Sequence, residues 1–281
     1  MTAAALLEDA AATLAAAGVP SPEWDAERLL RHVLGWDRAT LVASPERVVP
    51  EPDEVLFRAL LRRRAAREPL QYIVGTQAFW KHEFLVTPAV LIPRPETELL
   101  VETSLELLKG VERPAVVDVG TGSGCIALSI AAERPDAEVH ATDISEPALE
   151  VARENARRLG LERRVAFHHG NLLEPLAGLE GRIDLIVSNP PYVDLAERGT
   201  LAPEVRDYEP ATALFAADSL MYPARLAGAA REALRPGGSL VVEIGIGHKT
   251  LVTEAFVGAG LCPTAQKKDL SGVVRAIVGR A

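Results

Sequence analysis

The sequence predicts an α/β fold, in which a mostly parallel sheet covered by helices on both faces follows a small N-terminal helical domain. Two observations support this prediction. From residue 115 onward, short apolar runs typical of buried strands alternate with segments of helical periodicity. Before residue 70, apolar residues recur at helical spacing instead, as in the series Ala26, Leu29, Leu30, Val33 and Leu34.

Residues 1–70 are expected to form the helical domain. Ser21 and Pro22 are typical of a helix start, and Gly35 is typical of a helix end. A further helix is expected between residues 53 and 67. We interpret its basic run as a solvated helix face rather than a site for an acidic partner. This run contains Arg62, Arg63, Arg64 and Arg67.

Residues 71–98 are expected to connect this domain to the next, which would span residues 99–281. Their aromatic and β-branched residues predict short strands and a β-hairpin. These residues are Tyr72, Ile73, Val74, Phe79, Trp80, Phe84 and Val86. In the segment 91–98, Pro95 suits a first helical turn, and Glu96 and Glu98 suit the positive end of a helix dipole. A plain domain connector is the alternative interpretation of this segment.

The alternating part of the chain predicts where a ligand binds. Strands are expected at residues 116–119, 138–142, 165–168, 183–187 and 239–243, and helices at 124–132, 147–158 and 222–234. In open parallel sheets, ligands bind at the carboxyl ends of the strands. The residues that follow these strands are therefore the candidates for the functional site.

The composition excludes several classes of function. With 281 residues, of which 48% are hydrophobic, the chain can form one large domain or two unequal ones. A formal net charge of −9 argues against binding of nucleic acid through a broad electrostatic surface. No segment has the apolar length of a membrane span, and an N-terminus with Glu8 and Asp9 is unlike a signal peptide. We expect a cytoplasmic protein that binds neither membranes nor nucleic acid directly.

No metal site is expected. Cys125 and Cys262 lie far apart, which fits a reducing cytoplasm and gives no metal-type spacing. His168 and His169 are adjacent on a predicted strand, so their side chains point to opposite faces. Cys125 opens a predicted buried helix, where a cysteine usually acts as a small hydrophobe rather than a nucleophile.

A glycine-rich loop follows the first strand of the sheet. It contains Gly120, Thr121, Gly122, Ser123 and Gly124, and Asp118 precedes it. Glycines permit a tight turn and the close approach of a ligand to the backbone. The Gly-x-Gly-x-Gly spacing and the preceding acid favour S-adenosylmethionine over a nicotinamide cofactor. A strand-to-helix turn without a ligand is the alternative.

Two further loops are candidates for contacts with a nucleoside. Asp143 ends the second strand, about 20 residues beyond the glycine loop, where a carboxylate accepts both ribose hydroxyls. It could instead cap the next helix, although Ser145 can do so. Asn171 and Leu172 follow the third strand, where they would meet the adenine edge and ring. A plain loop is an equal alternative for this pair.

The strongest motif is Asn189-Pro190-Pro191-Tyr192, which ends the fourth strand of the sheet. Neither proline has a backbone donor, so carbonyl groups are left to face a ligand. The Asn189 oxygen and the Pro190 carbonyl would accept the two hydrogens of a planar NH2 group, while Tyr192 stacks on its face. The motif therefore predicts a site for an amide or an aromatic amine. A proline-rich turn is the alternative.

With these motifs, the sequence resembles the protein-glutamine methyltransferases that modify peptide chain release factors. The resemblance covers nearly the whole chain. Its motifs are residues 91–98, 118–124, Asp143, residues 188–192, Tyr208-Glu209-Pro210 and Glu243-Ile244-Gly245. The chain departs from the family pattern at Asn171, where an acidic residue is common, at residues 216–219, which are less glycine-rich than usual, and at His248, which replaces a frequent glutamine.

This resemblance implies a Rossmann-like class I methyltransferase domain that uses S-adenosylmethionine. The implied substrate is the glutamine of the Gly-Gly-Gln motif in release factors, which the N-terminal helices are expected to contact. The nearest rival is an adenine N6 amino-methyltransferase acting on DNA or RNA, because the same pocket suits an exocyclic amine. The acidic chain and the lack of a target-recognition domain count against it. The glycine loop disfavours a nicotinamide oxidoreductase, and the complete site disfavours a non-catalytic binding module.

Overall fold

The computed structural model describes residues 1–215 and 221–281, so the segment 216–219 discussed above lies outside the described residues. The chain divides into two compact units. The first contains residues 1–76 together with residues 202–208. The second contains residues 77–201 and 209–281. Each unit has a hydrophobic core of its own.

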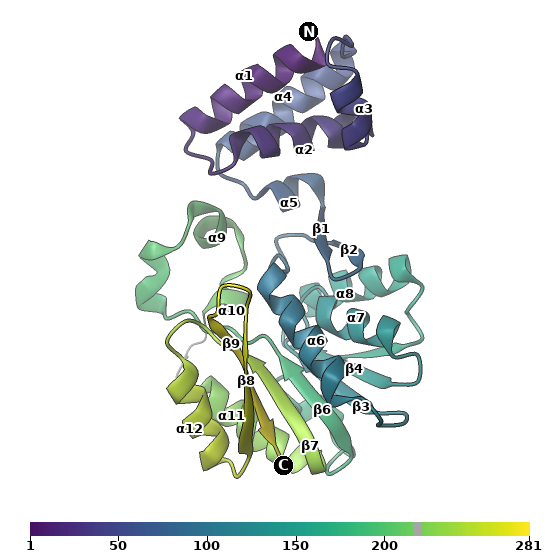
Figure 1. The fold of residues 1–281 in the computed structure, drawn as a ribbon, viewed down its shortest axis with the longest axis vertical. Helices are drawn as coiled ribbons and strands as arrows, with labels where there is room; N and C mark the ends of the chain where they lie inside the picture. Colours follow the sequence, from purple (N-terminus) through teal and green to yellow (C-terminus); the bar gives the residue numbers. More distant parts are fainter. Residues whose placement is uncertain (216–220) are drawn as a thin grey trace. The chain divides into compact units, whose positions relative to one another are not determined.

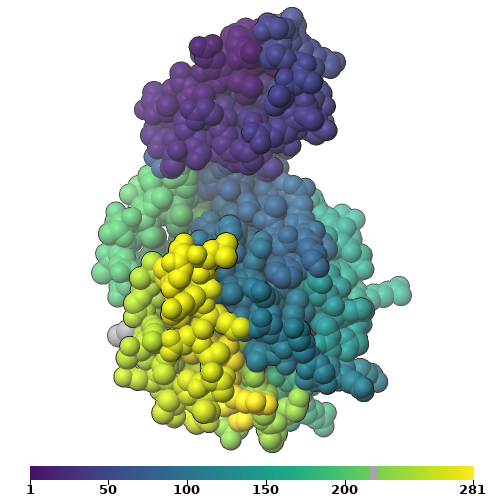
Figure 2. All heavy atoms as spheres, viewed as in Figure 1, coloured from purple at the N-terminus to yellow at the C-terminus, as the bar shows by residue number. Residues whose placement is uncertain are grey.

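The first unit is helical, as predicted, and most of it is the purple body of Figure 2. Its helices are α1 (Ala3–Ala16), α2 (Pro22–Leu34), α3 (Arg38–Ala43), α4 (Glu51–Ala65), α5 (Leu70–Val74) and α9 (Pro203–Tyr208). Leu6, Leu29 and Phe57 are among the fully buried side chains of its core. Pro22 begins α2, and Gly35 ends it in the left-handed conformation, as the sequence predicts.

The strand expected at Tyr72, Ile73 and Val74 is wrong, because these residues belong to α5. Pro69 precedes this single helical turn, and Gly75 ends it with a φ of 80°. The apolar run is buried in the core of the helical unit. Burial of a short run does not distinguish a strand from a helical turn, whereas the flanking proline and glycine do.

The prediction that the basic run forms a solvated helix face is also wrong at one position, Arg64. Arg64 is buried, with 5% of its surface exposed. Its Nε donates to Asp25 Oδ2 at 2.7 Å, and its Nη2 donates to Glu204 Oε1 at 2.9 Å. Arg67 also pairs with Glu204, at 2.7 Å. Because Glu204 lies 140 residues from Arg64 in the chain, no local pattern reveals this pairing.

The expected hairpin consists of β1 (Thr76–Phe79) and β2 (His82–Leu85) and, apart from its first residue, opens the second unit. The main sheet has seven strands in the order β5-β4-β3-β6-β7-β9-β8 (Figure 1). They are β3 (Ala115–Val119), β4 (Glu138–Asp143), β5 (Val165–His169), β6 (Ile183–Ser188), β7 (Leu234–Glu243), β8 (Cys262–Lys268) and β9 (Val274–Arg280). The first five are parallel, which confirms the predicted sheet.

Helices cover both faces of this sheet (Figure 1). One face carries α6 (Glu98–Leu107), α7 (Cys125–Glu133) and α8 (Glu146–Leu159), and the other carries α11 (Tyr222–Ala233) and α12 (Lys249–Gly258). Alternate residues of each strand enter alternate cores: Val116 packs with the first group, and Val117 with the second. The short elements are η1 (Pro95–Thr97), η2 (Glu174–Leu176), η3 (Leu195–Thr200) and α10 (Ala211–Leu214).

Strands β8 and β9 were not predicted from the sequence. β9 pairs antiparallel with both β7 and β8, and the two strands appear yellow on the near face of the unit in Figure 2. Exposed and half-buried residues alternate along the edge strand β8, which includes Gln266, Lys267 and Lys268. An edge strand of this polar composition lacks the apolar run by which buried strands are recognised. Among the described residues, no helix is long and apolar enough to cross a membrane.

Candidate active site

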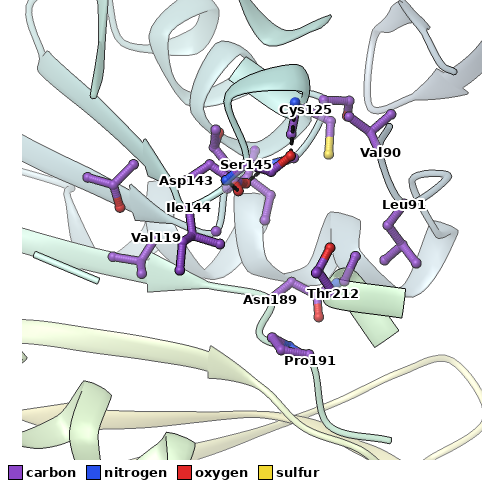
Figure 3. Close-up of a pocket in the computed structure, with 18 of the residues that line it drawn as sticks. Val90, Leu91, Val119, Cys125, Asp143, Ile144, Ser145, Asn189, Pro191 and Thr212 are labelled. Atoms are coloured by element: carbon purple, nitrogen blue, oxygen red, sulfur yellow. Dashed lines mark hydrogen bonds between the residues drawn. The ribbon is translucent and has the colours of Figure 1, made fainter. Parts of the chain in front are cut away.

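The order of the strands brings the predicted loops together. β3 lies between β4 and β6, and Val119 at its end is in register with Thr142 of β4 and Ser188 of β6. The loops that follow these three strands therefore start side by side, where the strand order reverses, and this is the expected position of a ligand in such a sheet. They line one cavity in the second unit (Figure 3).

Asp118 holds the glycine loop in place. Its Oδ2 accepts hydrogen bonds from Thr121 Oγ1 at 2.7 Å and from the Ala127 amide at 3.1 Å. Burial raises the pKa of Asp118 to about 7. Its Oδ1 is also buried and has no hydrogen-bond partner within the described ranges. The sequence indicated an acid before the loop but did not reveal this anchoring role.

The three glycines of the loop are required for different reasons. All have positive φ angles: 74° at Gly120, 56° at Gly122 and 81° at Gly124. A Cβ atom added to Gly120 or Gly122 would meet no protein atom within 4 Å, and both residues line the cavity. At Gly124, a Cβ would lie 3.0 Å from Leu128 and 3.2 Å from Ala152. Gly124 thus permits helix packing, whereas Gly120 and Gly122 leave backbone open to the cavity.

Ser123 completes the loop and also lines the cavity, as does Thr121. The carbonyl oxygen of Ser123 accepts a hydrogen bond from Asn155 Nδ2 at 2.9 Å. The same Asn155 side chain bonds the backbone of Leu85 in the hairpin, at 2.7 and 3.0 Å. Asn155 therefore fixes the glycine loop against β2, a contact that the sequence pattern did not indicate.

Asp143 lies on the cavity wall, as predicted (Figure 3). Its two oxygens accept hydrogen bonds from the Gly122 and Ser145 amides, each at 2.9 Å. Burial raises the pKa of Asp143, and these backbone donors oppose that rise. Ser145 Oγ caps α8 by accepting from the Ala148 amide at 3.3 Å, which confirms the assignment of this cap. Each carboxylate oxygen of Asp143 can accept a further hydrogen bond.

Asn171 and Leu172 also line the cavity. The Asn171 amide donates to Glu174 Oε1 at 2.9 Å, so one side of this side chain is held by a neighbouring residue. Ile144, which follows Asp143, lines the cavity with 65% of its surface exposed. An exposed apolar side chain at this point suits a flat ring, and sequence reasoning missed it although its place directly after Asp143 is a usable signal.

The four residues after β6 divide between two hollows. Asn189 and Pro191 line the main cavity, where Figure 3 shows them on a different wall from Asp143. Pro190 and Tyr192 line a smaller adjoining hollow, to which Pro191 also contributes. Asn189 Nδ2 donates to Thr97 Oγ1 at 3.1 Å, so its Oδ1 remains available as an acceptor. The stacking of Tyr192 on a bound amide stays a prediction.

The adjoining hollow explains the glycine at position 245. The rings of Tyr192 and His248 meet edge to face, with 6.5 Å between their centroids. A Cβ on Gly245 would approach Tyr192 to 2.9 Å and His248 to 3.0 Å. Glycine is therefore required for Tyr192 to pack at this position.

The segment 91–98 forms part of the cavity wall and does more than connect two domains. Leu91, Pro93 and Arg94 line the cavity. Arg94 forms an ion pair with the buried carboxylate of Glu209, and the second oxygen of Glu209 accepts from the Ile92 amide at 3.4 Å. Burial raises the pKa of Glu209, whereas Arg94 lowers it. Glu209 thus holds this wall in place.

Cys125, His168 and His169 show no arrangement for catalysis or for metal binding. Burial raises the pKa of Cys125 to about 12, so its thiol stays protonated. His168 bonds His140 at 3.1 Å, and His169 bonds the Ile144 carbonyl at 2.9 Å. In the part of the chain that the structure describes, no group of three or more potential ligands could hold a metal ion.

Comparison with known proteins places the chain in a family. Residues 5–75 match the family model described as the PrmC N-terminal domain, and residues 95–204 match the methyltransferase small domain. A release factor glutamine methyltransferase of Geobacter sulfurreducens is 43% identical over 95% of this chain and 92% of its own length. The chain belongs to the release factor glutamine methyltransferase family.

Other members of this family are similar over the full length. The Koribacter versatilis protein of the same name is 43% identical over 100% of this chain and 99% of its own length. A solved methyltransferase structure from Pyrococcus furiosus matches the fold with a TM-score of 0.50 and 20% identity, over 79% of this chain and 95% of the other. It supports the methyltransferase fold alone.

Proposed function

We propose that the protein transfers a methyl group from S-adenosylmethionine to the side-chain amide nitrogen of the glutamine in the Gly-Gly-Gln motif of peptide chain release factors. One observation carries this proposal. In a member of the release factor glutamine methyltransferase family, Asn189 opens into the same cavity as the glycine loop and Asp143. An amide acceptor and a nucleoside site thus share one space.

The cavity fits S-adenosylmethionine, which supplies an electrophilic methyl group when it is bound. The backbone of Gly120 and Gly122 is open to the cavity, because no side chain intervenes. Asp143 offers two oxygens to ribose hydroxyls, and Leu172 and Ile144 offer apolar surface to an adenine ring. Four further residues line the cavity and could contact the same ligand: Thr121, Ser123, Cys125 and Asn171.

Asn189 and Pro190 orient the substrate amide. Since Asn189 Nδ2 is held by Thr97, its Oδ1 accepts one amide hydrogen of the glutamine. The Pro190 carbonyl, to which no donor bonds among the described residues, accepts the other. Fixing both hydrogens directs the weakly nucleophilic nitrogen toward the methyl group. The nitrogen gains the methyl group and releases one proton.

A labelling experiment distinguishes this activity from the nearest rival. The enzyme is incubated with S-adenosylmethionine labelled in the methyl group, together with a release factor and DNA and RNA oligonucleotides. We expect label in the release factor, and a Gly-Gly-Gln to Gly-Gly-Ala release factor should remain unlabelled. Label in adenine instead would overturn the proposal, as would a failure to label either substrate.

The helical unit is proposed to contact the release factor. Its exposed large apolar residues include Val48, Val55 and Leu56, of which the last two are consecutive on α4. A variant with Val55→Glu and Leu56→Glu should raise the KM for the release factor while leaving the KM for S-adenosylmethionine unchanged. Val257→Glu, at an exposed position on α12, is the matched control. Equal changes in both KM values would argue against this contact.

We also place the reaction in the cytoplasm, without direct binding to nucleic acid. Cys125 and Cys262 are both free thiols, which is the state that a reducing compartment maintains.

A further inference from the structure

The loop after β6 rests on a buried carboxylic acid, Glu243, at the end of β7. Glu243 has 4% of its surface exposed, and its Oε2 is buried without a hydrogen-bond partner of normal geometry among the described residues. It lines the hollow that also contains Pro190 and Tyr192. A buried and incompletely paired carboxyl group costs stability, so its position in the hollow that adjoins the proposed substrate site requires an explanation.

Two hydroxyl groups that touch the site lie beside this carboxyl group. Burial raises the pKa of Glu243 to about 7, and the nearby Thr97 and Tyr192 hydroxyls oppose this rise, although neither forms a hydrogen bond of normal geometry with Glu243 among the described residues. Thr97 is itself buried, with 2% of its surface exposed, and its Oγ1 accepts the hydrogen bond from Asn189 Nδ2 at 3.1 Å. The hydroxyl group of Thr97 therefore bonds Asn189 and lies near enough to Glu243 to affect its ionisation.

The direction of these hydrogen bonds is determined by chemistry. A threonine hydroxyl has one hydrogen to donate, and an ionised carboxylate can only accept. When Thr97 donates to Glu243, its oxygen lone pairs are left to accept from the NH2 group of Asn189. The Asn189 side chain is then fixed with its NH2 group toward Thr97 and its oxygen toward the cavity.

We propose that Glu243 is a positioning residue for methyl transfer, which acts through Thr97 to keep the Asn189 oxygen facing the substrate amide. The opposite orientation would present an NH2 group to the NH2 group of the glutamine, where two donors repel. Glu243 also lines the same hollow as Tyr192, at the other end of the Asn189-Pro190-Pro191-Tyr192 segment. This inference rests on the proposed role of Asn189.

Glu243→Gln tests the direction of the hydrogen bonds from Thr97 and Asn189, with almost no change in side-chain volume. A glutamine amide can donate to Thr97 and so permits the reverse orientation. We expect the kcat for release factor methylation to fall about 10- to 100-fold, as when a partner that orients a site residue is lost. The Kd for S-adenosylmethionine and the Tm should be unchanged. Thr97→Val should lower kcat similarly, and the conservative Thr97→Ser, which keeps the hydroxyl, should restore most of it.

The pH profile is a second readout that a purely structural role would not change. Other charged or titratable groups near Glu243 are Arg275, Glu96, Tyr192 and His248. As the pH falls through about 7, protonated Glu243 becomes able to donate, so turnover of the wild-type enzyme should fall. The Glu243→Gln variant should lack this decrease, while any contribution of His248 remains in both proteins.

A double-mutant cycle separates this inference from the proposed function. If Glu243 acts through Asn189, then Glu243→Gln should have no further effect in an Asn189→Ala background. A full additional loss in that background would overturn the inference, as would a Glu243→Gln turnover within threefold of wild type or a parallel loss of cofactor binding. Near-normal turnover of Asn189→Ala alone would instead contradict the proposed function.

Discussion

A buried charge is fully paired in the helical unit, whereas the methyltransferase unit, besides the paired Glu209, contains two buried acids that are incompletely paired. In the helical unit, buried Arg64 has acidic partners on two other elements, Asp25 on α2 and Glu204 on α9. In the methyltransferase unit, the buried acids Asp118 and Glu243 each keep one oxygen without a hydrogen-bond partner among the described residues. Both acids have a pKa that burial raises to about 7.

This difference separates folding from function. A buried charge with partners on distant segments holds those segments together, and its loss lowers the stability of the fold. A buried acid with an unsatisfied oxygen lowers stability, and folding alone does not require it. Such groups concentrate at functional sites. Asp118 anchors the glycine loop, and Glu243 lies beneath the loop that contains Asn189. Four predictions test this contrast, from the largest expected effect to the smallest.

Arg64→Met should destabilise the helical unit by about 3–5 kcal/mol, because Asp25 is left buried without its partner. Native-state hydrogen exchange of the α2 and α4 amides measures this loss. Adding Asp25→Leu should recover much of it, since the uncompensated charge is then removed. A loss below about 1 kcal/mol in the single variant, the range of an exposed ion pair, would show that this pairing is unimportant.

Asn189→Ala should lower turnover by about two to three orders of magnitude, as when a hydrogen-bond partner of the transition state is removed. The Tm should hardly change, because among the described residues the side chain makes one hydrogen bond, with Thr97. Steady-state kinetics with a release factor, together with thermal unfolding, provides both measurements. A large loss of stability with normal turnover would reverse the roles that we assign to the two units.

Asp118→Asn should change how stability depends on pH. Because the pKa of Asp118 is raised to about 7 in the folded state, the wild-type protein loses stability as the pH rises from about 4 to about 7. The variant lacks this titration, so its free energy of unfolding relative to wild type should rise by on the order of 3 kcal/mol across that interval. Urea unfolding at pH 4 to 8 measures the difference, and a constant difference would show that burial does not perturb this carboxyl group.

Gly122→Ala should cost about 1–2 kcal/mol of stability, the penalty of a left-handed conformation for a residue with a side chain. It should also weaken binding of S-adenosylmethionine, because Gly122 lines the cavity. Gly124→Ala should destabilise the fold more, since its Cβ would press on Leu128 and Ala152. Thermal unfolding and calorimetric titration of the cofactor compare the two variants. Equal effects of both would mean that the glycines have one common role.

Much of the site follows from the sequence because its signals are local. The glycine loop, Asp143 and Asn189 each end a predicted strand, and parallel strands carry their ends to one edge of the sheet. The cap of α8 at Ser145 was likewise recognisable from residues within one helical turn. By contrast, α5 was mistaken for a strand, because an apolar run of its length has no distinctive period.

By itself, the sequence determined the alternating strands and helices from β3 to β7, the cofactor loop and the Asn189-Pro190-Pro191-Tyr192 motif that we propose to face the substrate amide. These features depend on propensities and spacings within a few residues. Only the tertiary structure decided which distant side chains hold them. Thr97 meets Asn189 across 92 residues, Glu209 meets Arg94 across 115, and Glu204 meets Arg64 across 140. Such partners are chosen by packing, because burial leaves a polar group only the neighbours that the fold places within reach.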